Sequence, residues 1–162
     1  MAAARKLRVA AGAGLAAPRE AEIVTVMLTN PFTGQTIERV SESEEVLVME
    51  TVYAAGGAPA PAHFHPAQDE RFVVLSGAVR AAVDGEKKVL REGDELIVAA
   101  GTPHEFGGHP EETATVRWEV RPPLRTWEFF EGLFGSLHAH AEGRGEEAGF
   151  DVAEYDDVFR LA

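Results

Sequence analysis

The sequence contains no cysteine, few basic residues and no long apolar run, and each absence excludes a class of protein. Without cysteine there are no disulfides and no thiolate chemistry. Lys and Arg number 15 against 27 Asp and Glu, giving a net charge of -12. Nucleic acids and anionic membranes are recognised by clustered basic side chains, so neither is expected as a partner. No apolar run approaches the roughly 18 residues that a membrane helix needs.

The length and composition predict one globular domain with a short N-terminal extension. The chain has 162 residues, of which 45% are hydrophobic and 26% charged, as in an ordinary globular protein. Residues 1–21 are rich in alanine and contain three early basic residues, which superficially resembles a signal peptide. Arg8 and several glycines interrupt the apolar part. We therefore predict that residues 1–21 form a flexible N-terminus and that the protein is cytoplasmic.

Short apolar runs separated by turn residues predict an all-β domain over residues 22–121. Turns recur every eight to twelve residues, as in a β-barrel or sandwich. Asp84-Gly85 is a favoured two-residue hairpin turn. The run 46–53 is apolar on both faces, which suggests that a second subunit covers its outer side. Strands are expected at 22–28, 35–40, 46–53, 78–83, 86–91, 95–98 and 113–120, and further strands begin near Glu70 and at His104.

The period of the apolar residues changes after Pro122 and Pro123. From Leu124 to about His140 they recur every three or four positions, at Leu124, Trp127, Phe130, Phe134 and Leu137. That spacing predicts an amphipathic helix. We favour core packing for this stripe over a ligand-binding role, and expect His138 and His140 on the surface. Residues 122–162 are thus predicted to form a C-terminal helix and an acidic tail. In the tail, we expect 141–149 to be a flexible linker and 150–162 to dock as a short helix.

Two histidines and a carboxylate lie together in the run 57–77. His63 and His65 are two apart, so on a strand they share one face. Glu70 follows five residues later and shares a strand face with Phe72 and Val74. If the two strands pair, two imidazoles and a carboxylate can converge on one point.

A third imidazole is available downstream, where His104 follows a Gly-Thr-Pro turn. Taken singly, an H-x-H pair is usually a polar strand face and a lone histidine a loop residue. In combination, three imidazoles and a carboxylate are a typical ligand set for a divalent transition metal, and they leave coordination positions open, as in catalytic sites. The predicted metal ligands are therefore His63, His65, Glu70 and His104. Fe, Mn, Ni and Zn all remain open as the metal.

These residues resemble the two motifs of the cupin superfamily. The first motif is G-x5-H-x-H-x3-4-E-x6-G, and Gly57, the predicted ligands and Gly77 match every fixed position. The second is G-x5-P-x-G-x2-H-x3-N; Gly93, Gly101 and His104 match, whereas Ala99 replaces its proline and Gly108 its asparagine. The resemblance implies a single cupin β-barrel of the jelly-roll type, to which the apolar period of residues 124–140 adds a C-terminal α-helical appendage. It also implies metal binding by the four residues and a homodimer.

Several functions remain open for such a site. The first is a metal-dependent oxygenase, in particular a dioxygenase, in which Glu70 becomes a base for a substrate proton. The second is isomerisation or decarboxylation of a small oxygenated acid or sugar. The third is non-enzymatic binding of a small ligand. The predicted lining, Phe72, Val74, Phe106 and Trp118, is apolar and aromatic, and Arg71 points away by strand parity. This favours a small apolar or aromatic substrate over a strongly anionic one.

Overall fold

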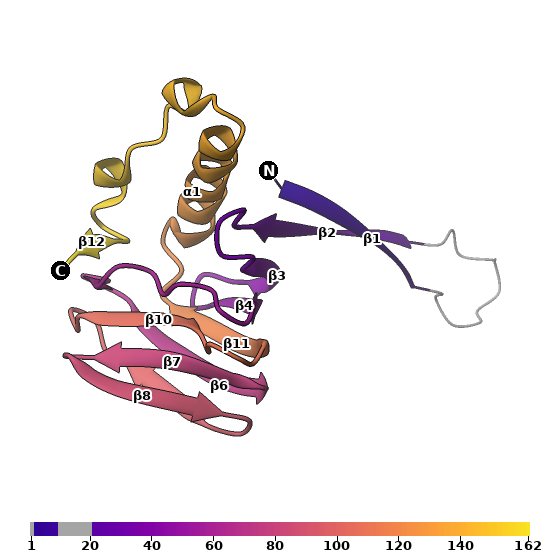
Figure 1. Ribbon diagram of the computed structural model, residues 1–162. Coiled ribbons are helices and arrows are strands. Elements are labelled where there is room, and N and C mark those ends of the chain that lie inside the picture. The colour runs from indigo at the N-terminus through magenta and orange to yellow at the C-terminus, as the bar shows by residue number, and fades with distance from the viewer. Residues whose placement is uncertain (1, 10–20) are drawn as a thin grey trace.

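The computed structural model describes residues 2–9 and 21–162, with side chains from Thr25 onward. Strands make up most of it, and a helix lies at the C-terminal end (Figure 1). Among the described residues, no helix is both long and apolar enough to cross a lipid bilayer. In chain order the elements are β1 Ala2–Val9, β2 Ala21–Thr29, β3 Thr36–Glu42, β4 Leu47–Tyr53, β5 His63–Phe64, β6 Asp69–Ser76, β7 Ala78–Val83, β8 Glu86–Arg91, β9 Glu95–Val98, β10 His104–Gly108, β11 Ala114–Arg121, α1 Thr126–Ala141, the 3₁₀ helices η1 Gly145–Glu147 and η2 Val152–Tyr155, and β12 Arg160–Leu161.

The strands form two sheets between which the chain repeatedly crosses. The larger has the order β1-β2-β3-β4-β11-β6-β9 and the smaller the order β12-β5-β10-β7-β8. From β4 to β11 the chain passes back and forth between the sheets, and every pair of neighbouring strands is antiparallel. This is a jelly-roll arrangement. The predicted all-β fold with a C-terminal helix is confirmed.

The two sheets share one core made by their inner faces. Phe72 on β6 stacks on Phe106 on β10 with ring centroids 4.2 Å apart, which links the larger sheet to the smaller. Trp118 on β11 stacks on the other side of Phe72 at 5.6 Å. All three side chains are buried, so the alternation seen in the sequence places the expected residues inside.

Turn residues fix the strand register at two points. Asp84 and Gly85 both have positive φ, at 49° and 79°, as a type I′ hairpin turn requires. Gly77 has φ 73°, and a Cβ added there would lie 2.1 Å from the Thr113 carbonyl oxygen. Only glycine fits that position, between β6 and β7.

The N-terminal strand β1 is a feature that the sequence patterns do not indicate. It pairs antiparallel with β2 over its whole length, from Ala2 opposite Leu28 to Val9 opposite Ala21. Figure 1 shows this hairpin at the end of the larger sheet, extending away from the other strands. The rest of the predicted flexible N-terminus, residues 1 and 10–20, lies outside the described residues.

The C-terminal region contains the predicted helix and a strand that was not predicted. Helix α1 spans Thr126–Ala141, close to the predicted 124–140. The prediction of a short helix over 150–162 is only partly right, since a 3₁₀ turn at Val152–Tyr155 is followed by β12. The strand forms because β5 leaves an unpaired edge. Arg160 pairs with Phe64 there, and the amide of Ala162 donates to the Ala62 carbonyl at 2.9 Å.

Candidate metal centre

The four predicted site residues meet between the two sheets. His63 on β5 is the register partner of His104 on β10 in the smaller sheet, and Glu70 enters from β6 in the larger sheet. His65 follows β5 directly. All four side chains are buried, and the three imidazoles offer nitrogen atoms that lie within 4.8 Å of one another. The expected convergence therefore occurs, but the predicted pairing of the two strands is wrong: β5 pairs with β10 and β12, and β6 lies in the other sheet.

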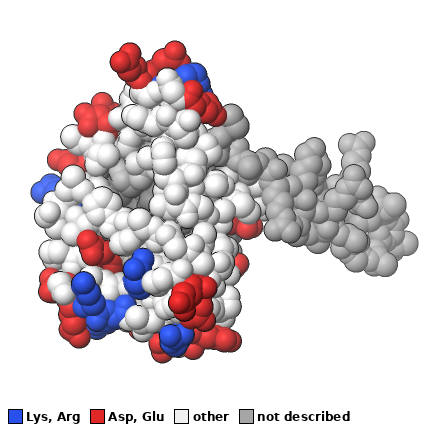
Figure 2. Space-filling model, in the orientation of Figure 1, with Lys and Arg blue, Asp and Glu red and all other residues white. Residues whose placement is uncertain are grey.

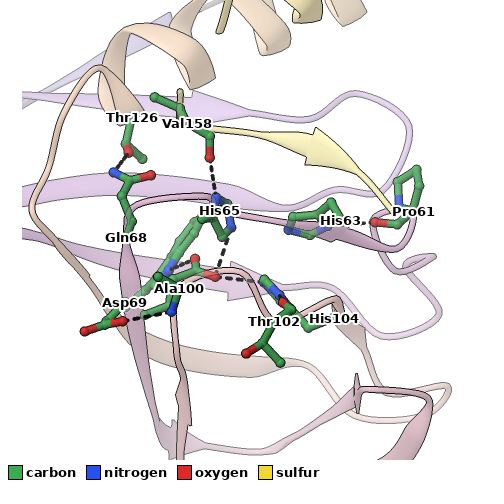
Figure 3. Close-up of polar contacts among 12 residues, drawn as sticks. Pro61, His63, His65, Gln68, Asp69, Ala100, Thr102, His104, Thr126 and Val158 are labelled. Atoms are coloured by element: carbon green, nitrogen blue, oxygen red, sulfur yellow. Dashed lines mark hydrogen bonds and ion pairs between the residues drawn. The ribbon is translucent and has the colours of Figure 1, made fainter. Parts of the chain in front are cut away.

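Each imidazole is oriented by a hydrogen bond from its Nδ1 to a backbone carbonyl (Figure 3). His63 donates to Pro61 at 2.7 Å, His104 to Thr102 at 2.9 Å and His65 to Val158 at 2.6 Å. A carbonyl oxygen can only accept, so Nδ1 bears the proton in each ring. In the neutral imidazoles Nε2 then carries a free lone pair, which is the arrangement typical of metal-binding histidines.

Glu70 faces two of these Nε2 atoms. Its Oε1 lies 3.0 Å from Nε2 of His65 and 2.8 Å from Nε2 of His104, while its Oε2 accepts a hydrogen bond from the indole Nε1 of Trp118 at 2.8 Å. Despite the short separation, His65 Nε2 and Glu70 Oε1 are buried without a partner of hydrogen-bond geometry. Buried acceptors that face one another are costly unless a cation lies between them. The donor set thus fits a metal ion.

The titration behaviour of the site follows from its burial and its charges. Burial lowers the pKa of His63 from 6.5 to about 4, so this ring is neutral at physiological pH. Burial alone would lower the pKa of His65 too, but the contact with Glu70 outweighs it and raises that pKa. For Glu70, burial alone would raise the pKa, and His104 and His65 in their protonated form hold it well below its usual range. Glu70 is therefore ionised at neutral pH.

The imidazoles face a largely apolar cavity of about 390 Å³. Phe72, Phe106 and Trp118 line it as predicted, whereas Val74 does not and packs in the core instead. Residues of the α1 stripe were expected to be core, and Trp127 is buried there. The stripe also forms a wall of the cavity, because α1 lies over the sheets at the metal end. The residues of α1 that line the cavity are Phe130, Phe134 and Leu137 of the stripe, together with Phe129 and Leu133.

The lining is poor in charge. Among the described residues that line the cavity there is no Lys or Arg, and Glu70 is the one carboxylate. In Figure 2 charged side chains gather at the top and bottom of the visible face, and its middle is uncharged. Arg71 points outward, as parity predicts, and pairs with Glu95 and Glu119. A strongly anionic ligand would find no counter-charge from the protein inside this cavity.

Other histidines are not part of the centre. The Nε2 of His138 donates to the Thr29 carbonyl at 2.8 Å, and the Nδ1 of His140 donates to the Ser136 carbonyl on the exposed side of α1. His109 accepts a hydrogen bond from the amide of Glu111 in a loop. All three lie outside the group of imidazoles that could hold a metal.

Sequence reasoning missed three contacts around the site. The hydrogen bond from Trp118 to Glu70 follows from the antiparallel pairing of β11 with β6, where Val120 lies opposite Glu70. Parity did place Trp118 on the inner face. The Val158 carbonyl and the Phe159 ring come from the far end of the chain. No local pattern could indicate them, because they precede a strand of only two residues, Arg160–Leu161.

Comparison with known proteins agrees with this architecture. A family model described as "Cupin domain" matches residues 49–120, which include all four site residues. Quercetin 2,3-dioxygenase of Bacillus subtilis is 27% identical over 121 residues, which is 75% of this chain and 32% of that protein. The probable oxidoreductase patJ of Penicillium expansum is 34% identical over 85 residues, 48% of this chain and 26% of that protein. The chain thus spans about a third or less of these curated relatives.

A solved structure gives the same result for the fold. The RmlC-like cupin from Shewanella frigidimarina superposes with a TM-score of 0.55 over 62% of this chain and 86% of that chain, at 19% identity. At this identity the likeness shows the fold alone. Residues 49–120 therefore match the cupin domain, and the chain has the cupin fold.

Proposed function

We propose that this protein is a metal-dependent oxygenase, most specifically a dioxygenase, that acts on a small apolar or aromatic oxygenated molecule. His63, His65, Glu70 and His104 would hold a divalent transition metal. The observation behind the proposal is the inward-facing set of unprotonated nitrogen and carboxylate acceptors at one end of an aromatic cavity. Imidazole nitrogen suits Fe, Ni and Zn, while carboxylate oxygen also suits Mn.

The bound ion would act as a Lewis acid and, if redox-active, would supply chemistry with O₂. Four protein ligands leave room for further ligands on an ion of higher coordination number. The remaining work belongs to side chains of this chain: burying the substrate, orienting it and moving its proton.

Glu70 is the proposed base. Its depressed pKa keeps it ionised at neutral pH, and its Oε2 accepts a hydrogen bond from the Trp118 indole. A carboxylate in that environment is a weak base. If Glu70 turns away from the imidazoles toward a substrate hydroxyl, it loses their stabilisation, its basicity rises and it can accept the hydroxyl proton. The Trp118 hydrogen bond to Oε2 leaves Oε1 free for that role.

The cavity supports an apolar or aromatic substrate. Its volume of about 390 Å³ lies within the range of small-molecule sites. Phe72, Phe106 and Trp118 offer stacked ring faces on the side of the sheets, and aromatic side chains of α1 lie on the other side. Such walls favour flat rings and exclude water. The name of the Bacillus subtilis relative specifies dioxygenation of quercetin, which supports oxygenation over isomerisation or decarboxylation.

The test is O₂ consumption by protein loaded separately with Fe²⁺, Mn²⁺, Ni²⁺ or Zn²⁺. The substrates are a panel of catechols, flavonols and diketones, and the control is the His63→Ala/His104→Ala double variant. We expect uptake with at least one redox-active metal, and none with Zn²⁺ or with the variant. Absence of turnover throughout the panel, combined with a small molecule that copurifies with the protein, would instead favour a non-enzymatic binding protein.

A further inference from the structure

We infer that the C-terminal segment Val158–Leu161 is a positioning element of the metal centre, which holds His65 and His63 from outside the cupin match at 49–120. The inference rests on the proposed metal site. It assigns to the end of the chain a role in ligand geometry in addition to covering the cavity.

The three imidazoles differ in where their orienting carbonyls come from. His63 and His104 each use a carbonyl two residues earlier in their own segment, Pro61 and Thr102. His65 uses Val158, which is 93 residues away in the sequence. Figure 3 shows the Val158 carbonyl pointing at His65 from the segment that leads into β12. The carbonyl that orients His65 therefore belongs to the C-terminal segment, whereas the carbonyls that orient His63 and His104 do not.

Phe159 gives the same segment a second contact with the centre. Its ring stacks on His63 with centroids 4.6 Å apart and an interplanar angle of 20°. The opposite face of Phe159 stacks on Phe129 of α1 at 5.1 Å and 22°. His63 is thus held in a three-ring stack, whose far member belongs to the helix that walls the cavity.

The segment is fixed on both sides. On one side β12 pairs with β5, with Leu161 opposite His63. On the other, Arg125 at the start of α1 forms an ion pair with Asp157 and donates to the Glu154 carbonyl. Val158 itself has no solvent exposure. These contacts leave the carbonyl and the ring little freedom, as a support for metal ligands requires.

The experiment measures Zn²⁺ affinity by competition with a chromophoric chelator, and the imidazole N–H groups of the Zn²⁺-loaded protein by ¹H–¹⁵N NMR. The variants are Phe159→Ala and a chain lacking residues 158–162. The matched control is Phe150→Ala, because Phe150 also packs on Phe129, at 5.8 Å, and contacts no imidazole among the described aromatic pairs. Loss of an outer contact to a metal ligand typically costs about 10–100-fold in affinity.

We expect the truncated chain and Phe159→Ala to bind Zn²⁺ about 10–100-fold more weakly than wild type, with Phe150→Ala unchanged. In the truncated chain one of three Nδ1–H signals, that of His65, should be lost to exchange with water while the other two persist. Unchanged affinity with all three signals retained would overturn the inference, as would an equal loss in Phe150→Ala and Phe159→Ala. If wild-type protein bound no metal at all, the proposed site itself would fail, which is a separate result.

Discussion

Replacing Trp118 by Phe should weaken metal binding without removing a ligand. The change keeps an aromatic ring and deletes the Nε1–H that donates to Glu70 Oε2 at 2.8 Å. Both side chains are buried, at 5% and 1% exposure, so water cannot take over the hydrogen bond. A hydrogen bond to a charged group contributes about 1.5–3 kcal/mol. That free energy corresponds to roughly a ten- to hundredfold weaker metal affinity, measured by chelator competition at neutral pH.

The chain provides its own control for this substitution. It has two tryptophans, and Trp127 is equally buried but is not among the residues that line the cavity. Its ring packs instead under the Arg39 guanidinium at 4.9 Å. Trp127→Phe should therefore lower the melting temperature and leave metal affinity unchanged. The reasoning is refuted if Trp118→Phe binds metal as tightly as wild type, or if the two variants lose the same affinity.

Three further predictions concern pH and the helix. Bound metal should be lost as pH falls below about 6, because protonated imidazoles cannot ligate; full retention at pH 4, measured after gel filtration, would contradict a three-histidine site. The hydrogen bond from Arg71 lowers the pKa of Glu119. The stability difference between wild type and Glu119→Gln should then be complete above the unfolded pKa of about 4.3 and vanish as pH falls through the lower folded value. Equal unfolding midpoints of wild type and Glu119→Gln at pH 7 would contradict this prediction. Gly135→Ala in α1 should stabilise the protein by about 0.5–1 kcal/mol, since its added Cβ meets nothing within 4 Å. Gly132→Ala should lack this gain because its Cβ would lie 2.5 Å from the Phe150 ring. Thermal unfolding of the two variants and wild type tests both expectations.

Much of the fold follows from local patterns. Alternation predicted β7, β8 and β9 with the bounds that the structure shows. The Asp84-Gly85 pair predicted their hairpin because few residues tolerate two successive positive φ angles. Motif spacing and parity selected the histidines and Glu70, but the pairing expected to bring them together is wrong, because β5 and β6 lie in different sheets. These features depend on residues close in sequence or on a single strand pairing.

The rest depends on contacts over long sequence separations. The helical stripe in 124–140 predicts α1 but cannot say which of its aromatic residues face the core and which face a cavity. Phe130 became a cavity wall because the helix lies over the opening between the sheets. Arg160 and Leu161 form a strand because β5 offers an edge more than 90 residues earlier in the chain. The predicted homodimer, which would cover the outer side of 46–53, stays a prediction.

The most direct test of the account is the metal content of protein purified without chelator and then loaded with excess metal and desalted. Inductively coupled plasma mass spectrometry would count the ions per chain in wild type and in the His63→Ala/His104→Ala variant, with folding checked by circular dichroism. The account predicts one transition-metal ion per wild-type chain and none in the folded variant. Equal metal content in the two proteins, or none in wild type after loading, would contradict it.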